Sequence, residues 1–373
     1  MKSSQIDALI IQALQYFEAG SLGSAEELLL AALKIEKKNL MALQMMGLIK
    51  ASIADHKSCI NFLRQAEKLS PSDPSIQYNL AKALSDFGDD RSAILHHERA
   101  TRLDPNNLMA WLNYGKSFSN IGRFKDALRA FEKALTINGN SLEARLNIGA
   151  TLTELSQYEK AIEIADAILE TNPNFAEAWS NKGGAYKGLN QYESALACYE
   201  KAVSLQPDNS QFWSNKGAAH VSLTQYEEAL ICCEKAIKLS PNFAEAWSNK
   251  ALALNDLKRY QEALESCNIA IRINPNYRES YWNRALILLT LGRLKEGWSD
   301  YEQRWGMETF ERPTFLSIPR LKSLYETADS KILVWSEQGL GDVIQFSRYL
   351  PCLQRLGASV TVRVQKQLEP LFK

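Results

Sequence analysis

The chain has 373 residues, which is too long for one ordinary hydrophobic core. Its 43 basic and 43 acidic residues cancel, so neither nucleic acid nor an anionic membrane is expected as a partner. The N-terminal stretch MKSSQIDALIIQALQYF interleaves polar and apolar residues and lacks a signal-peptide core, and no apolar run reaches the roughly 20 residues that span a bilayer. These features predict a cytoplasmic protein that does not bind membranes.

The sequence repeats itself with a period of 34 residues. The ten residues PNFAEAWSNK stand at 173–182 and again at 241–250, and a related PDNSQFWSNK lies midway at 207–216. Units that begin at 6, 40, 74, 108, 142, 176, 210, 244 and 278 bring the chain into register with itself, and the ninth changes character toward its end. Positions within a unit are counted from 1 at its first residue to 34 at its last.

Each unit combines bulky, small and helix-breaking residues at fixed positions. Position 4 is bulky in most units, position 20 is usually alanine, and position 32 is usually proline. Position 8 is small in every unit: Ala13, Gly47, Ala81, Gly115, Gly149, Gly183, Gly217, Ala251 and Ala285. Positions 4, 7, 8 and 11 share one face of a helix, positions 20, 24 and 27 share one face of a second, and the proline ends that second helix. The pattern predicts a helical hairpin in each unit.

One hairpin alone leaves an apolar face in water, so the hairpins are expected to stack into a superhelix with a concave inner surface. This pattern resembles the tetratricopeptide repeat (TPR) over residues 6 to about 311. The predicted fold class is all-α, a TPR superhelix of eight to nine hairpins followed by a short, truncated α/β segment. Trp179 and Trp247 are interpreted as core residues. Gly139, Arg145 and Gln77 depart from the pattern, and the weak first unit suits a capping position.

Position 6 is asparagine in seven consecutive units, although asparagine is a mediocre helix former. The seven residues, called the ladder here, are Asn79, Asn113, Asn147, Asn181, Asn215, Asn249 and Asn283. Their place on the helical wheel predicts that they follow the concave groove, beside Ser180, Ser214 and Ser248. A side-chain amide is both donor and acceptor, so the ladder and the serines are predicted to bind the backbone of an extended peptide.

The ladder also resembles the asparagine ladder of the repeat domain in O-linked N-acetylglucosamine transferase, and this resemblance implies that the groove grips protein substrates by their backbone. The alternative is that the amides bond only to neighbouring helices. The basic carboxylate clamp for chaperone tails is not expected, because units 6 to 8 place Ser, Asn, Gly and Ala on the inner helices.

Six cysteines include no CxxC pair, and four of them, Cys198, Cys232, Cys233 and Cys267, fall on the repeat grid. They are interpreted as small apolar fillers. A metal site is the alternative, but the four histidines show no ligand spacing with them. No metal and no cofactor are expected.

After the ninth unit the chain changes pattern. Residues 331–335 (KILVW) read as a strand, 336–342 (SEQGLGD) as a tight loop, 343–357 as a helix, 358–364 as a second strand and 365–373 as the start of another helix. Strand, loop, helix and strand mark the beginning of an open α/β fold. The predicted domains are therefore the array at 1–311, a linker at 312–330 and an incomplete α/β domain at 331–373.

Gly339, Gly341 and Asp342 lie where a strand turns into a helix, a place where backbone amides can hold a phosphate. Ile344 occupies the third glycine position of a dinucleotide fingerprint, so that motif is incomplete. A plain tight turn with Asp342 as a helix N-cap is the alternative.

The stretches EGWSDYEQRW and LVWSEQGLGDVIQFSRYLP resemble the junction in bacterial TPR proteins whose C-terminal half is similar to two-lobed, GT-B-type glycosyltransferases. The resemblance implies that Glu337, Gly339, Gly341, Asp342 and Gln345 line a cleft for a nucleotide sugar. Such a transferase needs two complete lobes, so the chain is expected to be truncated and inactive alone.

Two functions are predicted from the sequence. The leading hypothesis is a protein–protein interaction module whose groove binds an extended peptide; the rival is the acceptor-recognition part of a protein O-glycosyltransferase. Deletion of 312–373 would leave peptide binding intact in the first case. Self-association through the end repeats is left open.

Overall fold

The structure is a computed structural model that describes residues 2–307, 321, 326–336 and 339–372. Its backbone divides into two compact units, residues 1–303 and residues 304–373, which are described separately. The first is called the helical array and the second the C-terminal unit. No described helix is both long enough and apolar enough to cross a membrane.

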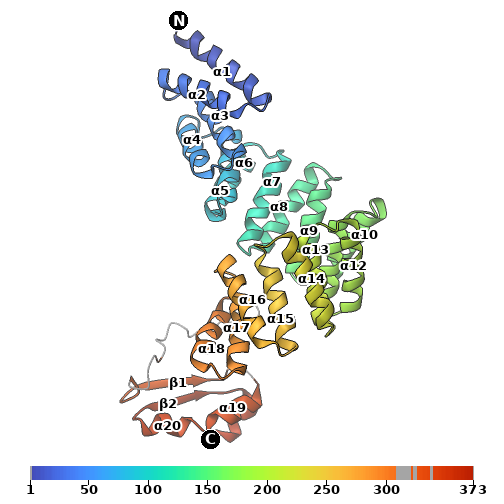
Figure 1. Cartoon of the computed structure of the whole chain (residues 1–373). Coiled ribbons are helices and arrows are strands. Elements are labelled where there is room, and N and C mark those ends of the chain that lie inside the picture. The colour runs from blue at the N-terminus through green and yellow to red at the C-terminus, as the bar shows by residue number, and fades with distance from the viewer. Residues whose placement is uncertain (1, 308–320, 322–325, 337–338, 373) are drawn as a thin grey trace. The chain divides into compact units, whose positions relative to one another are not determined.

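The helical array consists of hairpins, one per sequence unit, which follow one another in chain order (Figure 1). The first helices of the units are α1 (Lys2–Glu18), α3 (Leu40–Ser52), α5 (Pro74–Asp86), α7 (Leu108–Asn120), α9 (Leu142–Glu154), α11 (Ala176–Gly188), α13 (Ser210–Ser222), α15 (Ala244–Asp256) and α17 (Arg278–Thr290). The second helices are α2 (Leu22–Ile35), α4 (His56–Leu69), α6 (Asp90–Leu103), α8 (Phe124–Ile137), α10 (Tyr158–Thr171), α12 (Tyr192–Leu205), α14 (Tyr226–Leu239), α16 (Tyr260–Ile273) and α18 (Leu294–Tyr301). The predicted all-α hairpin array is confirmed.

Local sequence explains where the first helices start and stop. Asn39, Asp73 and Asn107 are N-caps whose side chains accept from backbone N–H groups of the first turn. Two residues after the end of every first helix, position 15 holds a residue with positive φ: Gly20, Ala54, Gly88, Gly122, Ser156, Asn190, Thr224, Lys258 and Gly292. A left-handed residue just after a helix reverses the chain, and here it turns the backbone into the second helix.

The position 8 glycines of units 2, 4, 6 and 7 pack against position 24 of their own unit. A Cβ atom on Gly115 would lie 2.4 Å from the ring of Phe131, and one on Gly183 would lie 2.7 Å from the ring of Tyr199. The alanines of position 20 are buried from Ala25 to Ala263. The two helices of a hairpin therefore approach closely because one presents bare backbone and the other a large side chain.

Units stack through positions 3, 7 and 10 of the first helix. Positions 3 and 10 are buried in units 2 to 9, whereas unit 1 places Ala8 and Gln15 there, both exposed. Position 7 of unit 1 is Gln12, which is exposed too. This polar end face explains why the first unit departs from the repeat: α1 caps the array.

First helices of neighbouring units contact one another from α1–α3 through α15–α17, and second helices make no comparable contact among the described residues. The first helices therefore form the inner layer of the solenoid, and the second helices form the outer layer. The ladder asparagines all stand on inner helices.

The residue at position 4 joins a hairpin to the turn before it. The indole Nε1 of Trp179 donates to the carbonyl of Pro173 (2.8 Å), and that of Trp247 donates to the carbonyl of Pro241 (3.0 Å). Both tryptophans are half-buried, and Trp179 packs against two apolar clusters. The interpretation as a core residue is supported for Trp179, whereas Trp247 is half-buried, and both ring nitrogens bond to the preceding turn.

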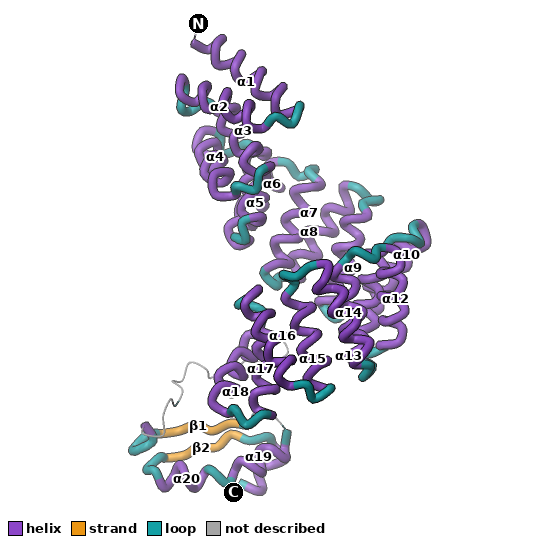
Figure 2. Tube along the Cα trace, in the orientation of Figure 1, coloured by secondary structure: helices purple, strands orange, loops and turns teal. Residues whose placement is uncertain are grey.

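The C-terminal unit contains two parallel strands, β1 (Lys331–Trp335) and β2 (Ser359–Arg363), with α19 (Leu340–Ser347) and α20 (Leu350–Arg355) between them. Lys331 pairs with Ser359, and Trp335 with Arg363. Two 3₁₀ helices, η1 (Glu302–Gly306) and η3 (Lys366–Leu371), complete the described elements, and the strands occur in this unit alone (Figure 2). The predicted linker lies mostly outside the described residues.

Two helix predictions in this unit are wrong. The helix predicted over 343–357 is interrupted at Arg348–Tyr349. The cause is Pro351, which stands in the first turn of α20 and lacks the N–H that a continuous helix would direct at the carbonyl of Ser347. The segment predicted to start a helix at 365 forms a 3₁₀ helix that contains Pro370.

Candidate peptide-binding groove

The ladder is fixed by hydrogen bonds that cross from one unit to the preceding one. The amide Nδ2 of Asn215 donates to Ser180 Oγ (3.2 Å), and that of Asn249 donates to Ser214 Oγ (3.0 Å). Asn283 repeats the bond with Ser248 Oγ (3.0 Å). Each bond joins position 6 of one unit to position 5 of the unit before it.

Two earlier units keep the bond but change the acceptor, whereas Asn79 makes no such bond among the described residues. Asn181 Nδ2 donates to the backbone carbonyl of Leu146 (3.1 Å), and Asn113 Nδ2 donates to Tyr78 Oη (3.1 Å). Asn147 breaks the series. The apolar Leu112 at position 5 of the unit before it does not explain the break, since Asn181 bonds to the backbone of the equally apolar Leu146. The Nδ2 atom of Asn147 is buried and has no partner among the described residues.

The three serines lie beneath the ladder. Ser214 is fully buried, Ser248 is 2% exposed and Ser180 is 8% exposed, whereas the asparagines above them are half-buried. A serine that accepts from an asparagine orients that amide and has little surface left to offer a ligand. Direct contact of the serines with a peptide stays a prediction; their place in the structure is that of positioning residues.

Each ladder amide keeps unused hydrogen-bonding capacity. An asparagine side chain carries two N–H donors and one acceptor oxygen. The inter-unit bonds of Asn181, Asn215 and Asn249 use one donor, whereas Asn283 Nδ2 reaches both the hydroxyl and, at 3.5 Å, the carbonyl of Ser248. No described residue donates to the Oδ1 of Asn181, Asn249 or Asn283 within hydrogen-bond distance. Asn215 Oδ1 accepts from Gln211 Nε2 (3.0 Å), which also reaches Glu245 Oε2 (3.2 Å).

A row of cations at position 7 is held away from the groove by ion pairs. Lys182 pairs with Asp166 at 2.6 Å, and Lys250 pairs with Glu234 at 2.9 Å. Each pair joins an inner helix to the outer helix of the preceding unit. Lys182 Nζ also lies 5.5 Å from the ring centroid of Trp179. These side chains fasten one unit to the next. The sequence could have indicated this function, because an acid stands 16 residues before each lysine and the pair recurs every 34 residues.

The buried cysteines behave as apolar fillers, as predicted. Cys232 and Cys233 are 4% and 0% exposed, and burial raises the pKa of the Cys233 thiol to about 12. The described residues contain no group of three or more His, Cys, Asp or Glu side chains that could hold a metal ion. The thiols therefore remain protonated near neutral pH and are poor nucleophiles.

The second predicted site lies partly outside the described residues. Glu337 and the side chain of Asp342 fall there. Gly339 precedes α19, and its carbonyl accepts from the N–H of Val343 (3.2 Å). Gly341 and Gln345 are exposed on that helix. Phosphate or nucleotide-sugar binding at these residues stays a prediction.

The geometry defines a class of protein: a solenoid of tandem helical hairpins with a uniform inner layer. Models of the tetratricopeptide repeat match 176–209, 210–243 and 244–277, and further models of this repeat match 122–183 and 78–141. Together these matches cover more than half of the chain, which belongs to the tetratricopeptide repeat family.

A solved structure shows the same fold. A tetratricopeptide repeat protein from Parabacteroides merdae ATCC 43184 matches with a TM-score of 0.60 and 20% identity, over 68% of this chain and 100% of that one. At this identity the likeness extends to the fold alone. A thermophilic TPR protein from Thermus thermophilus is 22% identical over 49% of this chain and 99% of that one, with a TM-score of 0.46.

Among curated proteins, Protein FlbA of Caulobacter vibrioides is 33% identical over 82 residues. The match covers 21% of this chain and 14% of that protein. The family-model matches lie within 78–277, so they give no support to a glycosyltransferase-like C-terminal domain.

Proposed function

We propose that the helical array is a protein-interaction module whose inner groove binds an extended segment of a partner protein along the ladder. The observation that supports this most directly is the shared orientation of Asn215, Asn249 and Asn283. All three donate one N–H to a serine hydroxyl of the preceding unit. Asn215 and Asn249 retain a second N–H, and Asn249 and Asn283 retain a free carbonyl oxygen; these are the two groups that a peptide backbone needs. The Nδ2 of Asn283 also reaches the backbone carbonyl of Ser248 (3.5 Å).

A fixed amide is a better ligand-binding group than a mobile one. Binding immobilises side chains at a cost of about 0.5 to 1.5 kcal/mol for each rotamer-rich side chain. The buried serines have already oriented the amides, so a peptide that meets them avoids part of this cost. The proposal therefore places the strongest backbone binding over units 7 to 9.

The chemistry of the groove also suits backbone recognition. The position 7 cations are paired with acids of the outer helices, so they offer little free positive charge to a carboxylate. Position 9 is Ala150, Gly184 and Ala218 in units 5 to 7, which leaves room for a peptide beside the amides. Amides flanked by small residues can bond to a main chain without selecting particular side chains.

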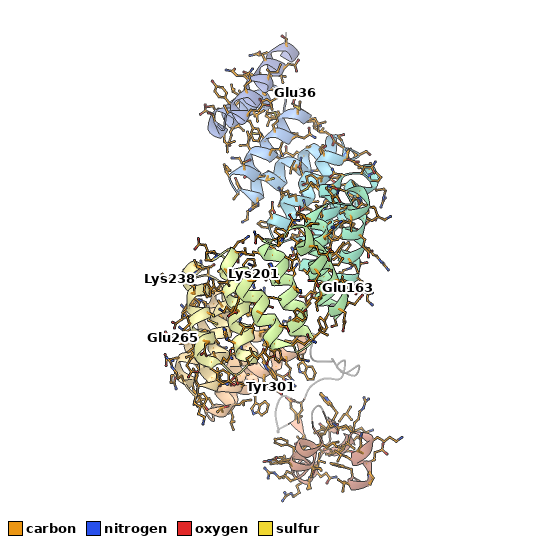
Figure 3. All side chains as sticks on the ribbon, turned by 90° about the vertical axis from the view of Figure 1, so that its right-hand side faces the viewer. Glu36, Glu163, Lys201, Lys238, Glu265 and Tyr301 are labelled. Atoms are coloured by element: carbon orange, nitrogen blue, oxygen red, sulfur yellow. The ribbon has the colours of Figure 1, made fainter. Side chains whose placement is uncertain are left out.

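The test compares partners captured from a bacterial cytoplasmic extract by the native chain and by the triple variant Asn215→Ala, Asn249→Ala and Asn283→Ala. A net hydrogen bond contributes about 0.5 to 1.5 kcal/mol, so the variant should bind groove partners at least tenfold more weakly. The matched control is Lys201→Ala, Lys238→Ala and Glu265→Ala, three exposed residues on the outer helices α12, α14 and α16 (Figure 3).

Thermal unfolding of all three proteins separates binding from folding. The control should retain every partner. If the ladder variant also retains them at native affinity, the asparagines serve only to join units and the proposal is wrong. A third variant, Ser180→Ala, Ser214→Ala and Ser248→Ala, should weaken binding less than the ladder variant, because the amides remain but lose their orientation.

A second candidate rests on the C-terminal unit, whose parallel β1–β2 pair is connected through helices as in the start of an α/β domain. In this alternative the array recognises protein acceptors for a glycosyltransferase that uses a nucleotide sugar. Binding of a labelled nucleotide sugar that is lost in Gly341→Val would support it. The interaction module alone would be favoured by two results: peptide binding survives removal of 312–373, and the chain binds no nucleotide sugar.

A further inference from the structure

The inner layer changes its chemistry along the array. Positions 2, 6 and 9 share one face of an inner helix, because they are spaced by four and three residues. Over units 3 to 9, position 6 of this face is always asparagine. In unit 1 the same position is Ile11, which is 59% exposed, and position 9 is Leu14, which is 42% exposed.

Unit 2 continues the apolar surface. Met41 at position 2 is 55% exposed and Leu48 at position 9 is 37% exposed. Both stand on α3, which contacts α1 on one side and α5, the first helix with a ladder asparagine, on the other. Ile11, Leu14, Met41 and Leu48 are called the apolar end of the groove.

The apolar end is not a leftover stacking surface. In units 2 to 9 the preceding unit covers positions 3, 7 and 10 of the inner helix. In unit 1 those positions are Ala8, Gln12 and Gln15, so the face that would receive a preceding unit is largely polar. Ile11 and Leu14 lie at the groove positions instead, where hydrocarbon exposed to water has no role in capping the array.

We infer that the apolar end binds hydrophobic side chains at one end of the same extended segment that the ladder holds by its backbone. This inference rests on the proposed function. The ladder bonds to main-chain groups that every peptide carries, so it cannot distinguish one sequence from another. The apolar end supplies that discrimination, because a segment that follows the ladder past α5 runs onto Met41, Leu48, Ile11 and Leu14.

The partner is therefore an extended segment that carries a cluster of leucine-like side chains at the end that meets the apolar end. Single apolar residues also stand at these groove positions farther along, Met109 in unit 4 and Leu286 in unit 9. Inner helices packed about 8 to 10 Å apart and an extended chain covering about 3.4 Å per residue set its length at about 24 residues for the whole array. This places the apolar cluster and the segment over units 7 to 9 well apart on the same peptide.

The test measures fluorescence anisotropy of three labelled synthetic peptides of about 24 residues, a length set by the spacing of the inner helices. One is built from Gly, Ser, Thr and Gln, and the other two add three leucines at the N-terminal or the C-terminal end. The full native chain should bind one of the two leucine peptides at least tenfold more tightly than the polar peptide, equivalent to about 1.4 kcal/mol. The triple variant Ile11→Ser, Leu14→Ser and Met41→Ser should lose that difference and keep the affinity for the polar peptide.

The matched control is Leu95→Ser with Ile231→Ser, two apolar residues on outer helices that are 58% and 66% exposed. It should keep the leucine preference, and thermal unfolding should be unchanged in both variants because the replaced side chains are exposed. Equal affinity of the native chain for all three peptides would overturn this inference and leave the ladder proposal standing. Failure of the native chain to bind any of them would overturn both.

Sedimentation of the native chain and of the triple serine variant tests whether a second copy of this chain occupies the apolar end instead. A monomer in both cases is the expected result. Self-association of the native chain that the serine variant abolishes would show that a second copy covers the apolar end, and the inference would be wrong.

Discussion

Units 6 to 8 differ from units 3 and 5 in the residue that joins a hairpin to the turn before it. In units 6 to 8 a tryptophan at position 4 donates to the carbonyl at position 32 of the preceding unit. Unit 3 has Gln77 there, and its Nε2 donates to the carbonyl of Pro71 at 2.9 Å. Unit 5 has Arg145, and its Nη2 donates to the carbonyl of Gly139 at 2.9 Å.

The comparison shows that position 4 is defined by a hydrogen bond as well as by bulk. Indole, amide and guanidinium groups all carry an N–H on a side chain long enough to reach back six residues. The ladder also varies, because its acceptor at position 5 of the preceding unit is a serine hydroxyl, the Tyr78 hydroxyl or the backbone carbonyl of Leu146. The Nδ2 of Asn147 is left without a partner among the described residues.

The largest expected effect on stability concerns position 24 of unit 3. His97 occupies the place of Phe131 in unit 4; it is fully buried, and neither ring nitrogen has a partner among the described residues. Burial lowers the pKa of His97 to about 4, with Asp90 raising it and His96 lowering it by smaller amounts.

The folded pKa lies below the unfolded value of 6.5. The titration of His97 therefore does not change the free energy of unfolding above pH 6.5, and it destabilises the fold as pH falls from 6.5 to 4. The loss amounts to about 3 kcal/mol at pH 4. His97→Leu, which copies Leu29 of unit 1, should remove this pH dependence and also stabilise the fold at pH 7. Urea unfolding of the native chain and of the His97→Leu variant at pH 7 and pH 4.5 measures how the free energy of unfolding of each depends on pH. Equal pH dependence in the two would show that His97 does not titrate on unfolding.

The next effect tests the close approach within a regular unit. Gly183→Ala should destabilise the array by about 1 to 3 kcal/mol, because the new Cβ meets the buried ring of Tyr199 at 2.7 Å. Gly184→Ala, one residue on, meets only the Tyr199 hydroxyl at 3.8 Å and should stabilise by about 0.5 to 1 kcal/mol. Chemical unfolding of the two variants gives opposite signs if position 8 is the contact point.

Unit 8 offers a check on this interpretation, since it pairs Ala251 at position 8 with Cys267 at position 24. The double variant Gly183→Ala with Tyr199→Cys copies that pair. It should lose less stability than the sum of the two single changes. Additive losses would mean that positions 8 and 24 of unit 6 do not constrain each other.

The sequence allowed the hairpins, their period and the buried side of each helix to be predicted, because these follow from local spacing. The contacts between units could not be predicted in the same way. Asn215 could be placed on the inner helix, but its bond to Ser180 depends on how two hairpins stack. The same holds for Trp179, whose burial was expected and whose bond to Pro173 was not. In the C-terminal unit the break between α19 and α20 could be predicted from the sequence, because Pro351 interrupts the helix-forming segment there.

A smaller effect tests whether the tryptophans of regular units need their ring nitrogen. Trp213→Phe keeps most of the ring but removes the donor to the carbonyl of Pro207 (2.7 Å), so it should cost about 0.5 to 1.5 kcal/mol. Tyr281→Phe at the same position of unit 9 is the control. No described residue bonds to the Tyr281 hydroxyl, and the change should be neutral in thermal unfolding. Equal losses in both variants would assign position 4 to packing alone.

The smallest effect concerns position 15, the residue with positive φ that follows each inner helix. Thr224 has φ +59° and Asn190 has φ +58°, so the two units place a β-branched residue and an asparagine in the same backbone conformation. Asparagine tolerates this region and a β-branched residue does not. Thr224→Asn should therefore stabilise the array by about 0.5 to 1 kcal/mol. The reciprocal Asn190→Thr should destabilise it by more, because it also removes the bond from Tyr192 Oη to Asn190 Oδ1 (2.7 Å). Two shifts of the same sign in calorimetry would show that neighbouring contacts, rather than backbone conformation, choose the residue at position 15.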